Sequence, residues 1–284
     1  MFLKKNILSK NIAMEDKFQK KFNTPPVGNT DAVIKSFVRP ILSFALVLAI
    51  WQLLCSRGVY SPYELPSPAM VLKATGEILK EGLLWKHLCI SLFRFVSAYF
   101  LAASSGIFLG LALGWSKVLL TYCDPLIQVL RPISPVAWFP LAILWFGVGN
   151  APAIFIIFLA AFFPVLLTAA TAVRQINPLF LKVAINFGAQ QGQLLWKVVL
   201  PASFPQIVVG LRLALGAAWI HLVAGEMLGA QSGLGFFIVD ARNFLRTDLI
   251  INGMIIIGLL GLTLDKLVAW LEKKVTARWG YAGR

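Results

Sequence analysis

The chain has 284 residues, of which 58% are hydrophobic and only 13% are charged. Ordinary soluble domains carry about 25% charged residues, so this composition excludes a protein whose whole surface faces water. The formal net charge of +14 is compatible with nucleic-acid binding, but the sequence contains no aromatic-basic platform for single strands and no groove-reading module, which argues against nucleic acid as a partner.

The N-terminal segment, residues 1–36, is rich in lysine and precedes the first apolar run. It has no apolar core beside its charges and includes Glu15, Asp16 and the Pro25–Pro26 pair, unlike a cleaved targeting peptide. Basic residues also gather near the C-terminus. Because lysine and arginine concentrate on the cytoplasmic side of membrane proteins, we expect both termini in the cytoplasm, with residues 1–36 and 277–284 as tails.

The apolar residues between these tails fall in runs long enough to cross a hydrocarbon core about 30 Å thick as helices. We expect an all-α integral membrane protein, with residues 37–276 as a multi-pass transmembrane domain containing six helices. The predicted spans are about 37–56, 87–115, 122–146, 151–173, 207–228 and 249–270.

Two features of the first half of this domain predict packing. Residues 69–84 have apolar side chains at helical spacing and balanced charge, which favours a helix lying on the membrane surface. Gly106, Gly110 and Gly114 follow at four-residue spacing in the second span. Three missing side chains on one helical face predict the close approach of another helix.

The third span contains Pro125, Pro132, Pro135 and Pro140. Proline removes a backbone donor from a helix, so this span is predicted to be kinked. Irregular backbone at membrane depth is tolerated only against protein or a water-filled cavity, which directs attention to the neighbouring Arg131.

Metal binding is not expected. Cys55, Cys89 and Cys123 lack the short paired spacing of zinc or redox sites, and we interpret them as structural thiols. His87 and His221 are isolated in the sequence and are interpreted as polar groups in helix interfaces.

Residues 182–201, KVAINFGAQQGQLLWKVVLP, are too polar and too short in their apolar stretch to form a span. A glycine in their middle predicts that a first short helix ends or bends there and a second begins, and Pro201 is expected to stop the second helix before the next span. The predicted product is a helix–turn–helix that protrudes into the cytoplasm.

This loop resembles the EAA loop of ABC-importer permeases, in which Ala184, Gly188, Val198, Leu200 and Pro201 match the spacing of the motif. The resemblance implies coupling helices that dock in a groove of the ATPase subunit. Lys182 stands where the motif usually has glutamate, which changes the local charge pairing expected with that subunit. The coupling-loop candidates are Lys182, Ala184, Gly188, Ala189, Leu195, Val198, Leu200 and Pro201.

Two further blocks, residues 202–238 and 124–155, closely resemble permeases of the nitrate, sulfonate, taurine and bicarbonate importer group. This resemblance implies the type I ABC-importer permease fold and import of a small anion across the bacterial inner (plasma) membrane by alternating access. It implies as partners ATP-binding subunits, a second permease copy, membrane lipid and a periplasmic or lipid-anchored solute-binding protein. The chain has no phosphate-binding GxxxxGK[ST] loop, so we expect no cofactor here and assign ATP and Mg²⁺ to the partner subunit.

Charged residues inside predicted spans are functional candidates, because burial in a bilayer is costly unless they face a cavity or a partner. Arg94 lies near a helix end, where snorkelling to the interface is an alternative. Arg212 is expected to pair with Glu226 or with an inner-leaflet phosphate. Arg131 either meets an anion in the pathway or bridges to Asp124, two turns away.

Glu226 is expected to make a structural or gating contact, since its charge would repel an anion, and two tryptophans either line a cavity or pack in the core. The candidate pathway residues are Arg131, Ser134, Trp138, Trp219, His221 and Glu226.

Three alternative functions remain. A permease of the same family could carry a different small solute. A secondary transporter driven by an ion gradient would usually show inverted repeats, which are not evident. A membrane-embedded enzyme would need clustered metal ligands or an activated nucleophile, and no such set emerges from the sequence, so catalysis by this chain is not expected.

Overall fold

The computed structural model describes residues 30–58 and 60–278, and the chain divides into two compact units, Met1–Tyr60 and Ser61–Arg284. Most of the predicted N-terminal tail and nearly all of the predicted C-terminal tail lie outside the described residues. The first unit contributes one helix, α2 (Thr30–Ser56), and contains the first predicted span. Its apolar part, Ile41–Ser56, exposes large hydrophobic side chains along its length.

The described part of the second unit is helical, without strands. Its elements are α3 (Pro68–Lys80), α4 (Leu83–Trp115), α5 (Lys117–Leu130), the 3₁₀ helix η1 (Pro135–Trp138), α6 (Phe139–Phe146), α7 (Asn150–Arg174), α8 (Pro178–Asn186), α9 (Gln191–Leu194), the π-helical turn η2 (Leu195–Val199), α10 (Leu200–Gly229), α11 (Leu234–Asn243) and α12 (Thr247–Arg278).

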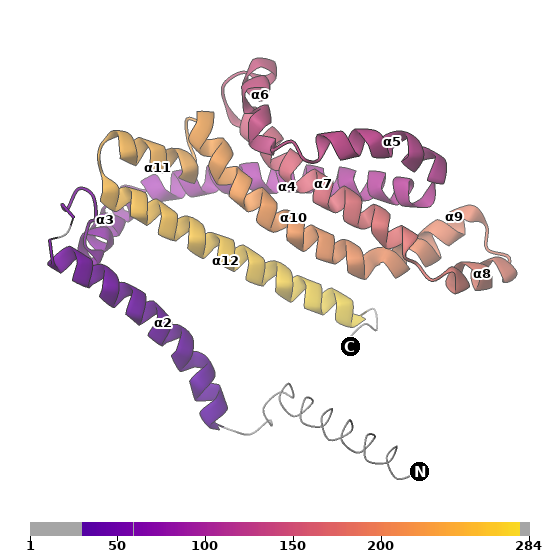
Figure 1. The fold of residues 1–284 in the computed structure, drawn as a ribbon, viewed down its shortest axis with the longest axis horizontal. Helices are drawn as coiled ribbons and strands as arrows, with labels where there is room; N and C mark the ends of the chain where they lie inside the picture. The colour runs from indigo at the N-terminus through magenta and orange to yellow at the C-terminus, as the bar shows by residue number, and fades with distance from the viewer. Residues whose placement is uncertain (1–29, 59, 279–284) are drawn as a thin grey trace, which may run out of the picture. The chain divides into compact units, whose positions relative to one another are not determined.

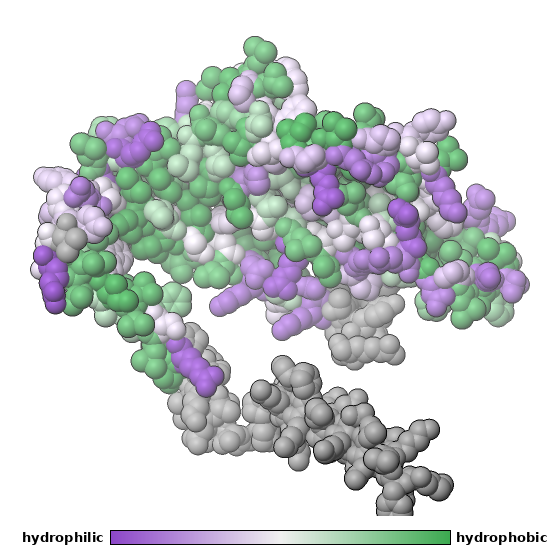
Figure 2. Space-filling view, in the orientation of Figure 1, coloured by the Kyte–Doolittle hydropathy of each residue, from purple (hydrophilic) through white to green (hydrophobic). Residues whose placement is uncertain are grey.

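Four helical stretches of the described residues are long and apolar enough to cross a membrane, namely Leu83–Trp115, Asn150–Arg174, Gln191–Gly229 and Thr247–Lys274. In Figure 1, α8 and α9 lie at one end of these long helices, and α3 and α11 lie at the other. Hydrophobic residues cover much of the visible surface between scattered hydrophilic groups (Figure 2), as expected for helices that face lipid or other subunits.

The closest packing is between α4 and α7, and it confirms the close approach predicted from the glycines. A Cβ atom added to Gly110 would lie 2.6 Å from both the Cβ of Ala169 and the carbonyl oxygen of Leu166. Gly114 is equally crowded by α7, and a Cβ atom at Gly106 would lie 3.0 Å from the Cβ of Val165. Small residues at a helix interface let the two backbones approach, which increases their van der Waals contact.

The core extends from the α4–α7 pair to α10 and α12. Buried alanines from α4, α7 and α10 pack with Phe95, Leu222 and Trp219. The ring edge of Trp219 contacts Phe95, and its Nε1 donates to the carbonyl oxygen of Ile257 in α12 at 3.2 Å. Trp219 is therefore a packing residue that also satisfies its own polar group.

The third predicted span is two helices rather than one kinked helix. Helix α5 ends at Leu130, and the Pro135–Phe146 segment leaves it at an angle of 86°. Neither Pro132 nor Pro135 can donate the backbone hydrogen bond that would continue the helix, so the chain breaks between them. The break places Arg131 at the end of α5.

Helix α3 also differs from the sequence prediction. Its apolar residues Val71, Ala74 and Ile78 are buried against protein instead of facing lipid. Asn252 of α12 fixes this contact by donating from Nδ2 to the carbonyl oxygen of Val71 at 3.0 Å. The helix packs on α12 and α4 because its apolar stripe is complementary to their side chains.

The expected stop at Pro201 is wrong. The helix that begins at Gln191 continues through the π turn and through Pro201 to Gly229, a stretch of 39 residues. Proline lacks the backbone N–H that an α-helical hydrogen bond would need. It is tolerated here because the π turn before it already departs from the regular α-helical hydrogen-bond pattern.

Candidate functional site

A cavity of about 400 Å³ lies where the broken span meets α7 and α10. It brings together three of the predicted pathway residues, Arg131, Trp138 and His221, which are separated by as many as 90 positions in sequence. Much of the remaining lining is apolar and comes from α7, including Phe163 and Leu167. An apolar cavity with a few convergent polar groups is the usual form of a small-molecule site.

A second cavity of about 560 Å³ adjoins this position and is lined by Asp124, Gln128 and Arg131, among others. Arg131 and Leu167 line both cavities. Within the described part of the chain, Arg131 forms no ion pair, and Asp124 instead accepts a hydrogen bond of 2.6 Å from Gln128 Nε2. The alternative of an Asp124–Arg131 bridge is therefore not realised, and the guanidinium is open to the cavities.

The other pathway candidates lie elsewhere or make local contacts. Ser134 is exposed and precedes η1. His221 Nδ1 lies 2.8 Å from the carbonyl oxygen of Ala217, one turn earlier in α10, while the ring borders the cavity. Trp219 belongs to the core, and Glu226 is completely buried in a different group of polar residues.

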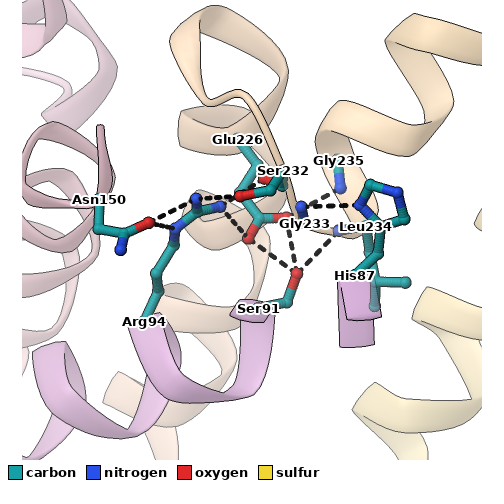
Figure 3. Close-up of polar contacts among 9 residues, drawn as sticks. All are labelled: His87, Ser91, Arg94, Asn150, Glu226, Ser232, Gly233, Leu234 and Gly235. Carbon is teal, nitrogen blue, oxygen red and sulfur yellow. Dashed lines mark hydrogen bonds and ion pairs between the residues drawn. The ribbon is translucent and has the colours of Figure 1, made fainter. Parts of the chain in front are cut away.

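That group is the Arg94–Glu226 cluster, made of His87, Ser91, Arg94, Asn150, Glu226 and the backbone of Ser232–Gly235 (Figure 3). Arg94 Nη1 donates to Glu226 Oε1 at 2.8 Å, and both residues are only 1% exposed. Figure 3 shows the guanidinium between Asn150 on one side and Glu226 and Ser232 on the other. Arg94 therefore does not snorkel, and Glu226 does not pair with Arg212.

Arg212 forms ion pairs on the surface of α10 and α12. Its Nε donates to Asp265 at 3.2 Å and its Nη1 to Glu272 at 3.4 Å, while its side chain is 43% exposed. An exposed pair of this kind contributes at most about 1 kcal/mol. Arg212 is thus a surface contact between two helices.

The Arg94–Glu226 cluster was not predicted as a unit, although the spacing of three of its residues is visible in the sequence. His87, Ser91 and Arg94 are four and three positions apart, which places all three on one face of α4. Their partners follow from tertiary packing and have no local sequence signal, because Asn150 and Glu226 are 56 and 132 positions from Arg94.

The predicted coupling loop is a pair of short helices joined by a tight turn. Helix α8 ends at Asn186, Gly188 has φ +82° and α9 begins at Gln191. Gln190 and Gln193 form a capping box at the start of α9. The left-handed backbone at Gly188 explains why the motif has glycine at this position.

A groove of about 630 Å³ runs between α8 and the start of α10. Ala184, Val198 and Pro201 line it, together with Phe180 and Lys197. The other candidates do not line this groove. Lys182 and Gly188 are exposed, and Ala189, Leu195 and Leu200 are half-buried.

The loop also presents large apolar side chains to the outside. Phe187 is 89% exposed and Trp196 is 68% exposed, one on each side of the turn. Exposed large apolar side chains that lie together mark surfaces for contact with another protein or with the membrane.

Comparison with known proteins identifies the family. Residues 105–278 match the family described as "Binding-protein-dependent transport system inner membrane component". The chain belongs to this family. The resemblance inferred from the sequence blocks is thereby confirmed, and the chain is a membrane transport subunit rather than an enzyme.

Individual relatives match over most of their length. The chain is 36% identical to the taurine transport system permease protein TauC of Escherichia coli strain K12, over 82% of this chain and 87% of that protein. It is also 36% identical to the nitrate import permease protein NrtB of Synechococcus elongatus, over 86% of this chain and 91% of that protein.

Among solved structures, an amino acid ABC transporter superposes with a TM-score of 0.55, covering 70% of this chain and 97% of that one at 15% identity. At this identity the likeness establishes the fold alone, and it confirms the predicted fold class of an all-α ABC-importer permease.

Proposed function

We propose that this chain forms the membrane pathway of an ATP-driven importer for a small oxyanion of the sulfonate or nitrate type. One observation carries the choice of an anion: Arg131 lines two cavities at the broken span and forms no ion pair within the described residues. The arginine side chain presents a rigid set of N–H donors, which bind the oxygens of planar and tetrahedral oxyanions in pairs.

The names of the relatives support the same chemistry. TauC and NrtB are named for taurine and nitrate, and each of these solutes presents several oxygens that share one negative charge. Trp138 and His221 border the same cavity as Arg131, so a bound oxyanion would have an aromatic wall and a second polar group within the lining.

The remaining subunits follow from the family and from the loop. A solute-binding protein delivers the anion, and ATP and Mg²⁺ are bound by separate ATPase subunits that dock on residues 182–201. Exposed Phe187 and Trp196 and the adjoining groove support that docking. A second copy of the permease completes the pathway, lipid surrounds it, and both termini lie in the cytoplasm of a bacterial cell with α8 and α9.

The test measures uptake of radiolabelled taurine and nitrate by the transporter reconstituted with its partner subunits. Arg131→Gln removes the charge, and we expect affinity for the transported anion to fall about 10- to 100-fold, since a hydrogen bond to a charged group contributes about 1.5–3 kcal/mol. Arg131→Lys keeps the positive charge but lacks the paired N–H donors of the guanidinium, so it should retain part of the affinity.

The matched control is Arg246→Gln, which removes an exposed arginine that pairs with Asp248 and Glu77 away from the cavities. Uptake should be unchanged in this variant. Equal uptake of the anion by the Arg131→Gln variant and the wild type would remove Arg131 from the pathway. Transport of a solute without an oxyanion group, with uptake of neither taurine nor nitrate, would assign the chain to a different substrate class.

A further inference from the structure

The helix that starts in the coupling loop reaches the opposite end of the bundle without a break. Residues Gln191–Gly229 form 39 consecutive helical residues, and at 1.5 Å per residue such a helix is about 58 Å long. A hydrocarbon core is only about 30 Å thick. One end of this helix therefore belongs to the coupling loop, and the other end carries Glu226 on the far side of the membrane domain.

At that far end, Arg94 uses all of its hydrogen-bonding capacity. Its Nε and Nη2 donate to Asn150 Oδ1 at 2.9 and 2.7 Å, and Nη1 donates to Glu226 Oε1 at 2.8 Å. Nη1 and Nη2 also donate to the carbonyl oxygen and the hydroxyl of Ser232, at 2.6 and 2.9 Å. A guanidinium has five N–H donors, so this single side chain ties α4 to α7, α10 and the α10–α11 linker.

A second set of bonds holds the backbone of the α10–α11 linker, residues 230–233, and of the first two residues of α11. The amide of Gly233 donates to His87 Nδ1 at 3.0 Å, that of Leu234 to Ser91 Oγ at 2.8 Å and that of Gly235 to Glu226 Oε2 at 2.9 Å. Three successive amides are thus bonded to side chains from α4 and α10. Moving this segment away from α4 breaks the bonds to His87 and Ser91, and moving it away from α10 breaks the bond to Glu226.

The Arg94–Glu226 cluster is tightly packed. A Cβ atom on Gly235 would lie 2.6 Å from the carbonyl oxygen of Val223, and the carboxylate of Glu226 fills the space beside Gly233. Within the described residues, every buried side-chain nitrogen and oxygen has a hydrogen-bond partner. Fully satisfied buried polar networks hold one arrangement and resist partial displacement.

We infer that Arg94 is a positioning residue that clamps the α10–α11 linker and the ends of α4 and α7 to the far end of α10, so that a displacement of the coupling loop arrives at the opposite face of the transporter. This inference rests on the proposed function, because it requires the ATPase subunits to move the loop. Arg94 touches no solute in this scheme and acts through the linker.

The test follows two fluorescent reporters in the complete transporter, reconstituted with its ATPase subunits in lipid nanodiscs. Cys55, Cys89 and Cys123 are replaced by serine, and bimane is attached to Asn186→Cys in α8 or to Gln231→Cys in the linker; both positions are exposed. A non-hydrolysable ATP analogue is then added. We expect the emission of both reporters to shift in the parent protein.

Arg94→Lys keeps the charge beside Glu226, but an ammonium cannot reach Asn150, Glu226 and Ser232 together. In this variant the reporter at residue 186 should still respond, while the response at residue 231 is lost. The matched control, Arg246→Lys, makes the same exchange in an exposed ion pair, and both reporters should respond.

An undiminished response at residue 231 in the Arg94→Lys variant overturns the inference, and so does a silent reporter at residue 231 in the parent when residue 186 responds. A silent reporter at residue 186 in the parent instead contradicts the coupling of the loop, and with it the proposed function. Should the Arg94→Lys variant lose both responses through failed assembly, Ser232→Ala removes one acceptor only and must reduce the response at residue 231 while that at residue 186 stays.

Discussion

The Cα of Gly233 lies so close to the carboxylate of Glu226 that a side chain at position 233 would overlap both carboxylate oxygens. Gly233 also has φ +106°, in the region that residues with a Cβ rarely adopt. Two independent requirements therefore select glycine at this position.

Gly233→Ala is expected to destabilise the protein by about 3 kcal/mol or more, because it adds backbone strain to a displaced buried ion pair. Thermal unfolding in detergent measures the effect. Gly216→Ala is the control, since a Cβ there meets nothing within 4 Å. An alanine in the middle of a helix should leave stability unchanged or raise it by up to about 1 kcal/mol. Equal melting temperatures for the two variants would contradict the crowding at Gly233.

The buried ion pair gives a second prediction. Glu226→Gln should cost about 3–5 kcal/mol, because it leaves the guanidinium of Arg94 buried without its counter-charge. The double variant Arg94→Met, Glu226→Met should lose less stability than the sum of the losses in its two single variants. Two apolar side chains leave no uncompensated charge in the buried site. A double-mutant cycle on unfolding in a mild denaturing detergent measures the difference. Additive losses would show that the pair is not coupled.

The α4–α7 interface can be tested with one methyl group. Gly110→Ala places a Cβ 2.6 Å from Ala169, where the neighbouring backbone cannot move aside, and overpacking of this kind costs about 1–3 kcal/mol. Gly258→Ala in α12 is the matched exchange at a site with open space. The expected order of melting temperatures is Gly258→Ala at or above the wild type and Gly110→Ala below it.

The turn in the coupling loop predicts a defect in assembly without a defect in folding. Gly188→Val forces a β-branched residue into φ +82°, so the angle between α8 and α9 should change and binding of the ATPase subunits should weaken. Co-purification with the ATPase subunit measures this, and the melting temperature of the isolated permease reports folding. Gly192→Ala, on the neighbouring helix with free space around it, should bind normally. Normal co-purification of the Gly188→Val variant would exclude the turn from the docking surface.

The sequence predicted those parts of the fold that depend on local pattern. The α4–α7 contact was predicted from Gly106, Gly110 and Gly114, because glycines at a period of four residues lie on one helical face. An irregular third span was predicted from the prolines around Arg131. The prolines did not predict a break of 86°. The direction of the chain after Pro132 depends on how η1 and α6 pack against α7 and α10, which is a tertiary contact.

Other parts depend on tertiary contacts. Pro201 was expected to end a helix, and it does not, because the preceding π turn absorbs the missing hydrogen bond. Snorkelling to the membrane interface was one of two interpretations of Arg94, and its burial follows from partners on three other segments. Arg131, Trp138 and His221 were candidates from residue type alone, and only the folded chain brings them to one cavity.

The position of Arg131 at the end of α5 also matters for electrostatics within the bilayer. Aligned peptide dipoles give the C-terminus of a helix a partial negative charge of about half an electron. Arg131 is the C-terminal cap of α5, so without its guanidinium the helix end would direct this negative potential toward the cavities. In the proposed function, the positive charge of Arg131 offsets the negative end of the helix dipole, so that the broken end of α5 can face the pathway of an anion.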